Sequence, residues 1–315
     1  MKRAQQLATI TVFLTVILIG VGVFVRASGS GLGCPDWPTC HGDFIPPNQK
    51  HALIEVSHRI VASVVGLLVI ANAVLAWKYY RHVPFILWLA TVIPPLVGFQ
   101  GILGAITVVR ELPAEIVATH LVVAMVVLSA EIALAIAMYR EDPERREKYA
   151  AANPVARPLG RLAIIAIVWL IATFWIGGYM AESGAATACD QWPTCVNGNI
   201  FPGADEHEAV HMAHRYLAGG FVLFLIPVTM AALRRKGDIS WAGPLGIAMA
   251  ALWVVQVAVG ALNVIYVFPD MLTVSHTVIA SLIWGTLTTM IALAYYVVDD
   301  PVPVGRQAPP RRVLA

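Results

Sequence analysis

The sequence predicts an all-α integral membrane protein whose eight transmembrane helices form two pseudo-twofold-related four-helix bundles. Three observations support this fold class: a composition that is 58% hydrophobic and 13% charged, eight long apolar runs, and a repeat of the first half of the chain in the second. Soluble domains carry about a quarter charged residues. The net charge of +2 is too small for a nucleic-acid-binding surface. The composition therefore excludes a soluble enzyme, a disordered chain and a nucleic-acid binder.

The apolar runs are each long enough to cross a bilayer, which takes about 20 residues. Each is predicted to be a helix, because unpaired polar backbone cannot face lipid, and their continuous hydropathy argues against the alternating strands of a β-barrel. The first run has a basic start like a signal peptide, but it lacks a small-x-small cleavage site and is predicted to be a retained anchor. The runs lie at about 8–25, 52–77, 85–109, 115–139, 160–180, 208–233, 241–266 and 271–297.

Lysine and arginine are distributed unequally between the two sides of these spans. All 21 except Arg26, Lys50, Arg59, Arg110 and Arg215 fall on the side that carries the termini. The positive-inside rule therefore predicts a multi-pass protein of the plasma membrane with both termini cytoplasmic. The expected division of the chain is an N-terminal bundle over 1–140, a cytoplasmic linker over 141–160, a C-terminal bundle over 161–298 and a disordered cytoplasmic tail over 299–315.

The two halves share motifs at a nearly constant spacing. An even number of helices per half makes the repeat parallel, with its axis along the membrane normal, and each four-helix bundle can hold a cofactor. The matched positions are Cys34 and Cys40 with Cys189 and Cys195, 155 residues apart, and His58, Arg59, Gln100, Gly104 and His120 with His214, Arg215, Gln256, Gly260 and His276, 156 residues apart.

Five of the nine histidines fall in the first turns of the four helices that begin at the outer face: His58, His120, His211, His214 and His276. A single interfacial histidine commonly binds water or a backbone carbonyl, but ionisable groups within spans are usually functional. Each half supplies one histidine from its second helix and one from its fourth. Two facing imidazoles are what axial ligation of a haem iron requires, so the pairs His58/His120 and His214/His276 are predicted iron ligands. Zinc is disfavoured because the second half lacks a third donor.

The two predicted sites differ in one carboxylate. Glu55 has His211 as its counterpart, and on a helix it shares a face with His58 three residues later. A buried carboxylate beside an iron can move protons or stabilise a cationic intermediate, whereas the alternative is a helix-terminal charge favoured by the macrodipole. The first half is therefore the candidate chemical site, with Glu55 as its catalytic residue, and the second is a candidate electron-transfer site.

Other polar groups have two open interpretations each. Arg26, Arg59, Arg110 and Arg215 lie near the level of the histidines and either contact haem propionates or snorkel to the interface. The pairs Cys34/Cys40 and Cys189/Cys195 lie in outer loops, where disulfides persist, and are either structural bridges or redox-active pairs. The remaining intramembrane polar residues are predicted to tie helices together, namely Gln100, Glu131, Gln256 and Asn263.

Several spaced elements together resemble the haem A synthase family, from Arg26 to about Trp284. They are the Gly-Ser-Gly-Leu-Gly-Cys-Pro-Asp-Trp-Pro-Thr-Cys stretch at 29–40, the Glu-x-x-His-Arg motif at 55–59, and His120, His214 and His276. The cysteine pairs resemble those of the bacterial cysteine-containing class. The resemblance implies oxidation of haem O to haem A, by successive hydroxylations that convert the C8 methyl group into a formyl group for terminal oxidases.

The same resemblance implies roles for individual residues and partners. His214 and His276 would ligate a low-spin haem b, His58 and His120 would bind the substrate haem O, and Glu55 would be essential to the chemistry. A haem O synthase, an unidentified electron donor and membrane lipid are the expected partners, and nucleic acid is not. The alternatives are a b-type cytochrome that carries electrons to or from quinone, a membrane thiol oxidoreductase and a haem transporter. A pure electron carrier gains nothing from a carboxylate at one iron only.

Overall fold

The computed structural model describes residues 1–141, 156–201 and 205–296, and within them the chain is helical. Eight spans among these residues are long and apolar enough to cross a membrane, which confirms the predicted all-α membrane fold class. Most of the expected linker over 141–160 and all of the expected tail over 299–315 lie outside the described residues. The helices are α1 (Lys2–Ala27), α2 (Lys50–Tyr79), α3 (Pro84–Val109), α4 (Ala114–Arg140), α6 (Arg157–Glu182), α7 (Glu206–Gly220), α8 (Val222–Arg234), α9 (Ala242–Ile265) and α10 (Asp270–Tyr295).

The sixth span differs from the single helix that its apolar run predicts. It consists of α7 and α8, which meet at Phe221. Two adjacent glycines, Gly219 and Gly220, precede this junction, and Pro227 follows it within α8. Glycine loses the most backbone entropy in a helix, and proline cannot donate the next backbone hydrogen bond. The local sequence therefore weakens the helix on both sides of Phe221. At its start, α7 is capped by the Asp205 side chain, which accepts from two backbone N–H groups.

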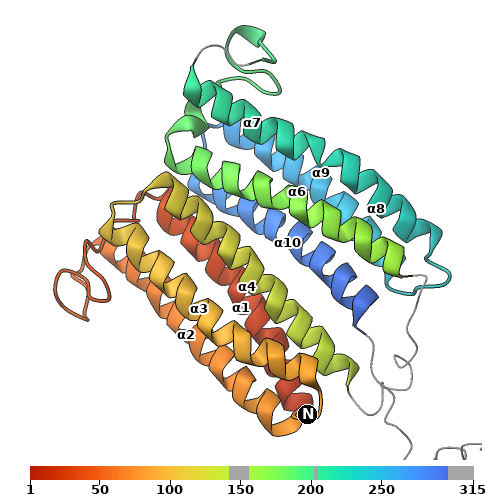
Figure 1. Cartoon of the computed structure of the whole chain (residues 1–315). Coiled ribbons are helices and arrows are strands. Elements are labelled where there is room, and N and C mark those ends of the chain that lie inside the picture. Colours follow the sequence, from red (N-terminus) through yellow and green to blue (C-terminus); the bar gives the residue numbers. More distant parts are fainter. Residues whose placement is uncertain (142–155, 202–204, 297–315) are drawn as a thin grey trace, which may run out of the picture.

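Figure 1 shows two bundles lying side by side, one of α1–α4 and one of α6–α10. Contacts between the bundles join α1 to α10, α4 to α6, and α4 to α10. In the repeat, α1 corresponds to α6 and α4 to α10, so the first two contacts are equivalent and the third pairs a helix with its own counterpart. That pattern is what a pseudo-twofold axis between the bundles requires.

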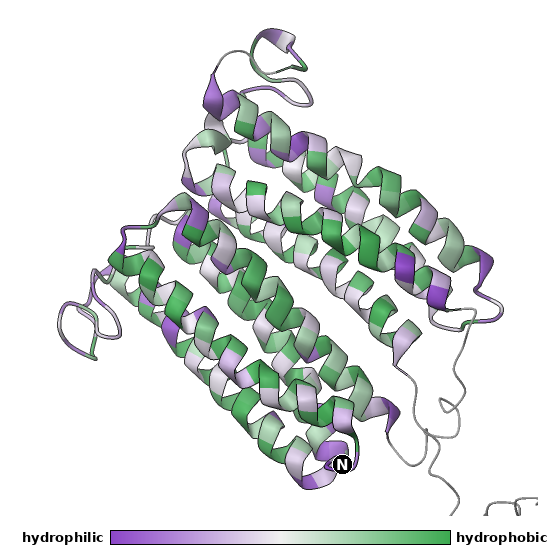
Figure 2. Cartoon of the chain, in the orientation of Figure 1, coloured by the Kyte–Doolittle hydropathy of each residue, from purple (hydrophilic) through white to green (hydrophobic). Residues whose placement is uncertain are grey.

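Residues near this axis contact their own repeat counterparts. Arg140 Nη1 donates to the backbone oxygen of Tyr296, 156 residues later. The centre of the interface is filled by Trp284 of α10, whose indole N–H donates to Ser129 Oγ of α4 at 2.7 Å. The Trp284 ring also packs edge-on against Phe174 of α6. One apolar core joins the second bundle to the facing sides of α1 and α4, and a second core lies within the first bundle. The outer surfaces of both bundles are strongly apolar, as expected of lipid-facing helices (Figure 2).

Two long loops leave the same end of the molecule, away from the N-terminus (Figure 1). The first cysteine loop spans residues 28–49 and the second spans residues 183–205, of which 183–201 and 205 are described. We refer to this end as the loop face. The helices that carry the histidines, α2, α4, α7 and α10, all begin there. Each begins slightly before its predicted apolar run, so His120 and His276 lie in the second turn of their helices and His58 and His214 in the third.

Candidate functional site

The four histidines of the repeat lie at similar depths, two in each bundle. His58 is eight residues into α2 and His120 is six residues into α4. In the second bundle His214 is eight residues into α7 and His276 six residues into α10. All four are half-buried. His58 lies within electrostatic range of His120, and His214 within range of His276, so the structure brings together both predicted pairs.

The His214 and His276 rings are neighbours, with their centroids 6.4 Å apart and their planes inclined by 66°. An imidazole nitrogen binds a metal at about 2 Å, so two imidazoles on opposite sides of one metal would have ring centres about 6 Å apart. The separation in the second bundle therefore fits two axial ligands of a single iron. Among the described residues no group of three or more His, Cys, Asp or Glu side chains could enclose a metal.

Each of these histidines packs against a glycine of the preceding transmembrane helix. A Cβ atom would lie 2.8 Å from Cε1 of His214 at Gly177, and 3.0 Å from Cε1 of His58 at Gly22. The corresponding distances are 3.0 Å from Cε1 of His276 at Gly260 and 3.4 Å from Cε1 of His120 at Gly104. We call these four residues the glycine seats. They form cradles that a methyl group would fill, so they set how far each imidazole sits from its neighbouring helix.

The Nδ1 atoms of His58, His120, His214 and His276 are all buried without a hydrogen-bond partner. Buried polar atoms are almost always hydrogen-bonded, so four exceptions at equivalent positions require an explanation. Glutamine side chains contact two of these histidines. Gln100 Nε2 donates to the His120 carbonyl oxygen, and Gln256 Nε2 lies 3.1 Å from His276 Nε2. The orphaned nitrogens, the glycine seats and the ring separation together fit a bis-imidazole haem site in the membrane.

Glu55 links α2 to the first cysteine loop. Its Oε1 accepts from Arg59 Nη2 at 2.5 Å, and its Oε2 accepts from the Cys34 backbone N–H at 2.7 Å. The side chain is nearly completely buried, with 3% of the residue exposed. Glu55 thus lies one turn before His58, and both of its oxygens have protein donors.

Its counterpart His211 makes an analogous contact in the second half. Nδ1 of His211 donates to the carbonyl oxygen of Ala185 in the second cysteine loop, at 3.1 Å. Both residues therefore attach a loop to the helix below it. A carboxylate stands at this position in the first bundle and an imidazole in the second, so the predicted asymmetry between the halves lies directly beside the histidine pairs.

Arg59 and Arg215 each hold their own cysteine loop. Arg59 donates to the carbonyl oxygens of Asp36 and Thr39, at 3.0 and 2.7 Å. Arg215 Nη1 donates to the carbonyl oxygen of Thr194 at 2.6 Å, the equivalent of Thr39, while its Nη2 is buried without a partner. This third role, binding loop carbonyls, was not foreseen from the sequence. Contact with haem propionates stays a prediction for Arg59 and Arg215.

Arg26 joins the two halves of the molecule. Its Nε forms an ion pair with Glu182 Oε2 at 3.1 Å, and its Nη2 donates to the backbone oxygen of Ala181, its own counterpart in the repeat. Propionate contact stays a prediction for Arg26 as well. The sequence analysis did not single out Glu182, although its position directly after the counterpart of Arg26 was a usable signal. Arg110, at the end of α3, is exposed.

The cysteines are paired within their own loops. The Sγ atoms of Cys34 and Cys40 are 2.03 Å apart and those of Cys189 and Cys195 are 2.00 Å apart, which is bonding distance. All four cysteines are buried. Each pair closes a short loop above the helix that carries Glu55 or His211.

Two fused four-helix bundles, each with a facing histidine pair near the same membrane face, define a haem-binding type of membrane protein. The chain belongs to the family of cytochrome oxidase assembly proteins, whose family model matches residues 5–288. It is 31% identical over 296 residues to the heme A synthase of Alkalihalophilus pseudofirmus, covering 92% of this chain and 96% of that protein. It is 29% identical over 305 residues to the heme A synthase of Shouchella clausii, covering 93% and 97% of the two chains. A third relative, the heme A synthase of Geobacillus kaustophilus, is 28% identical over 298 residues, or 93% of this chain and 91% of that one.

Proposed function

We propose that this protein is a haem A synthase, a membrane oxidoreductase that converts haem O to haem A for the assembly of terminal oxidases. The reaction oxidises the C8 methyl group of haem O to a formyl group. One observation carries the proposal: two histidine pairs occupy equivalent places in two bundles, but only one pair has a carboxylate beside it. The similarity to heme A synthases along 92% of the chain supports the same conclusion.

The two bundles have different tasks in this proposal. His58 and His120 of the N-terminal bundle, residues 1–140, hold the substrate haem O, and His214 and His276 of the C-terminal bundle, residues 161–298, hold haem b. A haem iron with two imidazole ligands supplies one-electron transfer. Support for the second assignment comes from the 6.4 Å ring separation of His214 and His276. Support for the first comes from Glu55, which lies one turn before His58.

Glu55 is the acid–base residue of the substrate site. Oxidation of a methyl group releases protons, and a carboxylate one turn from His58 can accept them. Its present partners, Arg59 and the Cys34 N–H, hold the carboxylate at the loop side of His58. The loop and Glu55 are therefore positioned together, so a movement of the first cysteine loop would also change the position of Glu55.

The cysteine pairs are structural disulfides in this proposal. Their sulfur atoms are at bonding distance and buried, so a redox partner would have no direct access to them. Arg59 and Arg215 bind carbonyls of the same loops, which supports a role in ordering the loops above the haem sites. A thiol oxidoreductase would need at least one accessible cysteine.

The protein is placed in the plasma membrane with both termini cytoplasmic. The unequal distribution of lysine and arginine supports this orientation. The loop face, with its histidine pairs and paired cysteines, then lies at the outer side, where disulfides persist. A haem O synthase would supply the substrate, and an electron donor of unknown identity is the other proposed partner. The oxidant and the oxygen atom for the hydroxylations must also come from outside the chain.

The function is tested by identifying the haems that the protein binds. The full-length protein, produced in cells that make haem O, should yield haem b and haem A when its haems are extracted and identified by mass. In Glu55→Ala, haem A should disappear while the haem b spectrum persists. Glu115→Ala, which removes an exposed carboxylate at the start of α4, is the matched control and should retain haem A.

Two outcomes would contradict the proposal. If the wild-type protein contained haem b but never haem A, it would be a b-type electron carrier. If Glu55→Ala still accumulated haem A at the wild-type level, Glu55 would have no catalytic role.

A further inference from the structure

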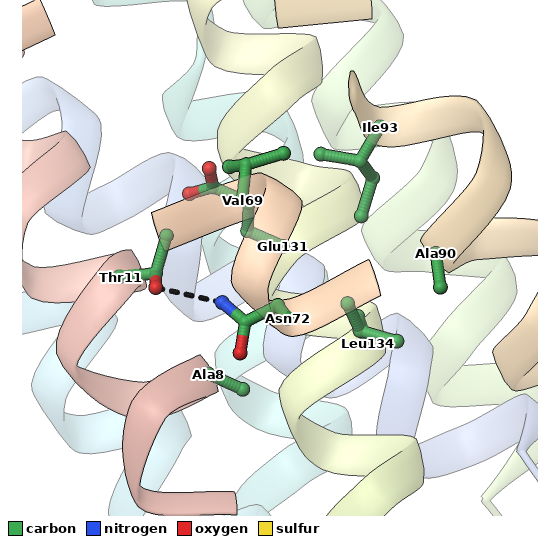
Figure 3. Close-up of a pocket in the computed structure, with 8 residues that line it drawn as sticks. All are labelled: Ala8, Thr11, Val69, Asn72, Ala90, Ile93, Glu131 and Leu134. Carbon is green, nitrogen blue, oxygen red and sulfur yellow. Dashed lines mark hydrogen bonds between the residues drawn. The ribbon is translucent and has the colours of Figure 1, made fainter. Parts of the chain in front are cut away.

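A small internal cavity lies in the first bundle, in the membrane interior and away from the histidine pair. Its volume is about 10 Å³, close to the space that one water molecule requires. Two residues from each of α1, α2, α3 and α4 line it, and the close-up shows them converging (Figure 3). Among the lining residues Glu131 is the only ionisable one, and Thr11 and Asn72 are the other polar ones.

Glu131 has no hydrogen-bond partner in this environment. Its residue is 3% exposed, and both carboxyl oxygens are buried without a partner. The role of Glu131 in tying helices together stays a prediction, and its nearest polar neighbour on another helix is Thr15 of α1. An ionised carboxylate is costly in the membrane interior. A protonated carboxyl group is far less so, and it is both a donor and an acceptor.

The neighbours of Glu131 have unused acceptors. Asn72 Nδ2 donates to Thr11 Oγ1 at 2.8 Å, the dashed line in Figure 3, which leaves Asn72 Oδ1 buried without a partner. Thr15, beside the Glu131 carboxyl group, also has a buried hydroxyl without a partner. Three of these unsatisfied oxygen atoms, both of Glu131 and Oδ1 of Asn72, belong to residues that line the one-water space, and Thr15 adjoins Glu131. A bound water needs two to four polar partners, and this site provides them.

The second bundle shows that the fold does not require these polar residues. With the repeat spacings of 155 residues for α1 and 156 for α2 and α4, the counterparts of Thr11, Thr15, Asn72 and Glu131 are Ala166, Leu170, Val228 and Leu287. All four counterparts are buried and apolar. The same place in the second bundle is therefore packed with hydrocarbon, and the polar cluster belongs only to the half that carries Glu55.

The cluster lies in the same bundle interior as His58 and His120. Glu131 follows His120 by 11 residues in α4, which is about three helical turns or roughly 16 Å, and returns it to nearly the same helix face. Asn72 follows His58 by 14 residues in α2, close to four turns. Gln5 and Tyr80 are the next buried polar side chains toward the opposite end of the bundle, where Gln5 Nε2 donates to the Met138 carbonyl oxygen.

We propose that Glu131, Asn72, Thr11 and Thr15 form an intramembrane proton-binding site. Glu131 carries a proton at neutral pH, one water molecule joins its carboxyl group to Asn72 Oδ1, and Thr15 stands beside the same carboxyl group. The first bundle can then take up or release a proton in its interior, which the second bundle cannot do. The proposal depends on the geometry of the cluster and holds whether or not the protein makes haem A.

Infrared spectroscopy of the purified, haem-loaded protein tests this site directly. The carbonyl stretch of a neutral carboxylic acid should be visible at neutral pH, should shift in D₂O, and should shift again when glutamate is labelled with ¹³C. The glutamate label separates this band from those of haem propionates. The band should be lost in Glu131→Gln and retained in Glu115→Gln, which removes an exposed carboxyl from the same helix.

The bound water has its own test. Asn72→Val, which introduces the residue found in the second bundle, should shift the Glu131 band because one partner of the water is removed. If Glu131→Gln fails to fold, a protein with Thr11→Ala, Thr15→Leu, Asn72→Val and Glu131→Leu provides the comparison, since it copies packing that the second bundle already uses. A neutral-carboxyl band that survives removal of Glu131, or the absence of any glutamate band in the wild type, would overturn the proton site. A band unchanged by Asn72→Val would overturn the shared water.

Discussion

Gly177 of α6 packs so closely against His214 that a Cβ atom there would lie 2.8 Å from the imidazole Cε1. Real Cβ atoms do not approach another heavy atom so closely, so an alanine at this position must displace the ring. The same contact occurs at Gly22, Gly104 and Gly260, each against its own histidine. The glycine seats therefore relate helix packing directly to the positions of the four proposed haem ligands.

Gly177→Ala should weaken haem binding in the second bundle. Overpacking costs about 1 to 3 kcal/mol, and here the strain falls on His214. The b-type absorption of the purified protein is expected to drop several-fold, with a smaller effect for Gly260→Ala, where the contact with His276 is 3.0 Å. Gly219→Ala is the control, because a Cβ there meets nothing within 4 Å. Equal spectra for the Gly177 and Gly219 variants would contradict this role of the seats.

The Arg26–Glu182 ion pair should stabilise the contact between the bundles. The side chains are 29% and 15% exposed, so solvent screens the pair only in part. We expect a coupling of about 1 kcal/mol, the upper end of the range for exposed pairs. A double-mutant cycle with Arg26→Met and Glu182→Gln, followed by unfolding in detergent, measures it. Replacement of the exposed Arg110 by Met should show no coupling to Glu182→Gln, and additive effects for Arg26 would refute the stabilising role.

The first cysteine loop should become less ordered at acid pH, whereas the second should not. Hydrogen bonds from the Thr39 hydroxyl and then from the Gly42 and His41 N–H groups lower the pKa of Asp36 to about 2. Because the folded pKa is below the ordinary value of 3.8 for an aspartate, the carboxylate stabilises the loop above pH 4 and loses that effect as the pH falls toward 2.

The corresponding position in the second loop is Gln191, whose Oε1 accepts from the Gly198 N–H at 3.0 Å and does not titrate. Hydrogen exchange of the His41 and Gly42 amides, corrected for the intrinsic rate at each pH, should therefore accelerate between pH 4 and 2. In Asp36→Gln the acid-dependent change should vanish. The same acceleration in the Gln variant would show that another group is responsible.

Replacement of all four cysteines by serine should lower haem A formation without abolishing it. The buried pairs order the loops, but the histidines are carried by the helices, and Arg59 and Arg215 still hold the loop carbonyls. Before this test, digestion of the alkylated wild-type protein without reductant should give linked peptides for Cys34/Cys40 and Cys189/Cys195. Complete loss of haem A in the serine variant, with haem b retained, would instead indicate a redox role.

The spans and the paired histidines could be predicted from the sequence because both depend on local pattern. A run of apolar residues needs no knowledge of its neighbours, and the repeat aligned His58 with His214 and His120 with His276 without any structure. The same repeat located the asymmetry at Glu55. What it could not supply was the distance between helices, so Gly22 and Gly177 went unnoticed even though they are repeat counterparts.

The sequence also could not predict which hydrogen-bond and ion-pair partners the fold brings to a given side chain. Arg59 binds loop carbonyls and the Glu55 carboxylate, and Arg26 binds Glu182 from the other half. A sequence shows that such a cation exists at a given depth but not which acceptor the fold brings to it.

The Arg26–Glu182 contact gives the two halves complementary charges where they meet. Arg26 has Ala181 as its counterpart and Glu182 has Ala27, so each half contributes one charge of opposite sign next to the pseudo-twofold axis. Two copies of the first half would bring two guanidinium groups to this place, and two copies of the second would bring two carboxylates. Separately produced halves should therefore prefer to assemble with each other over self-association, although their interfaces descend from one repeated pattern.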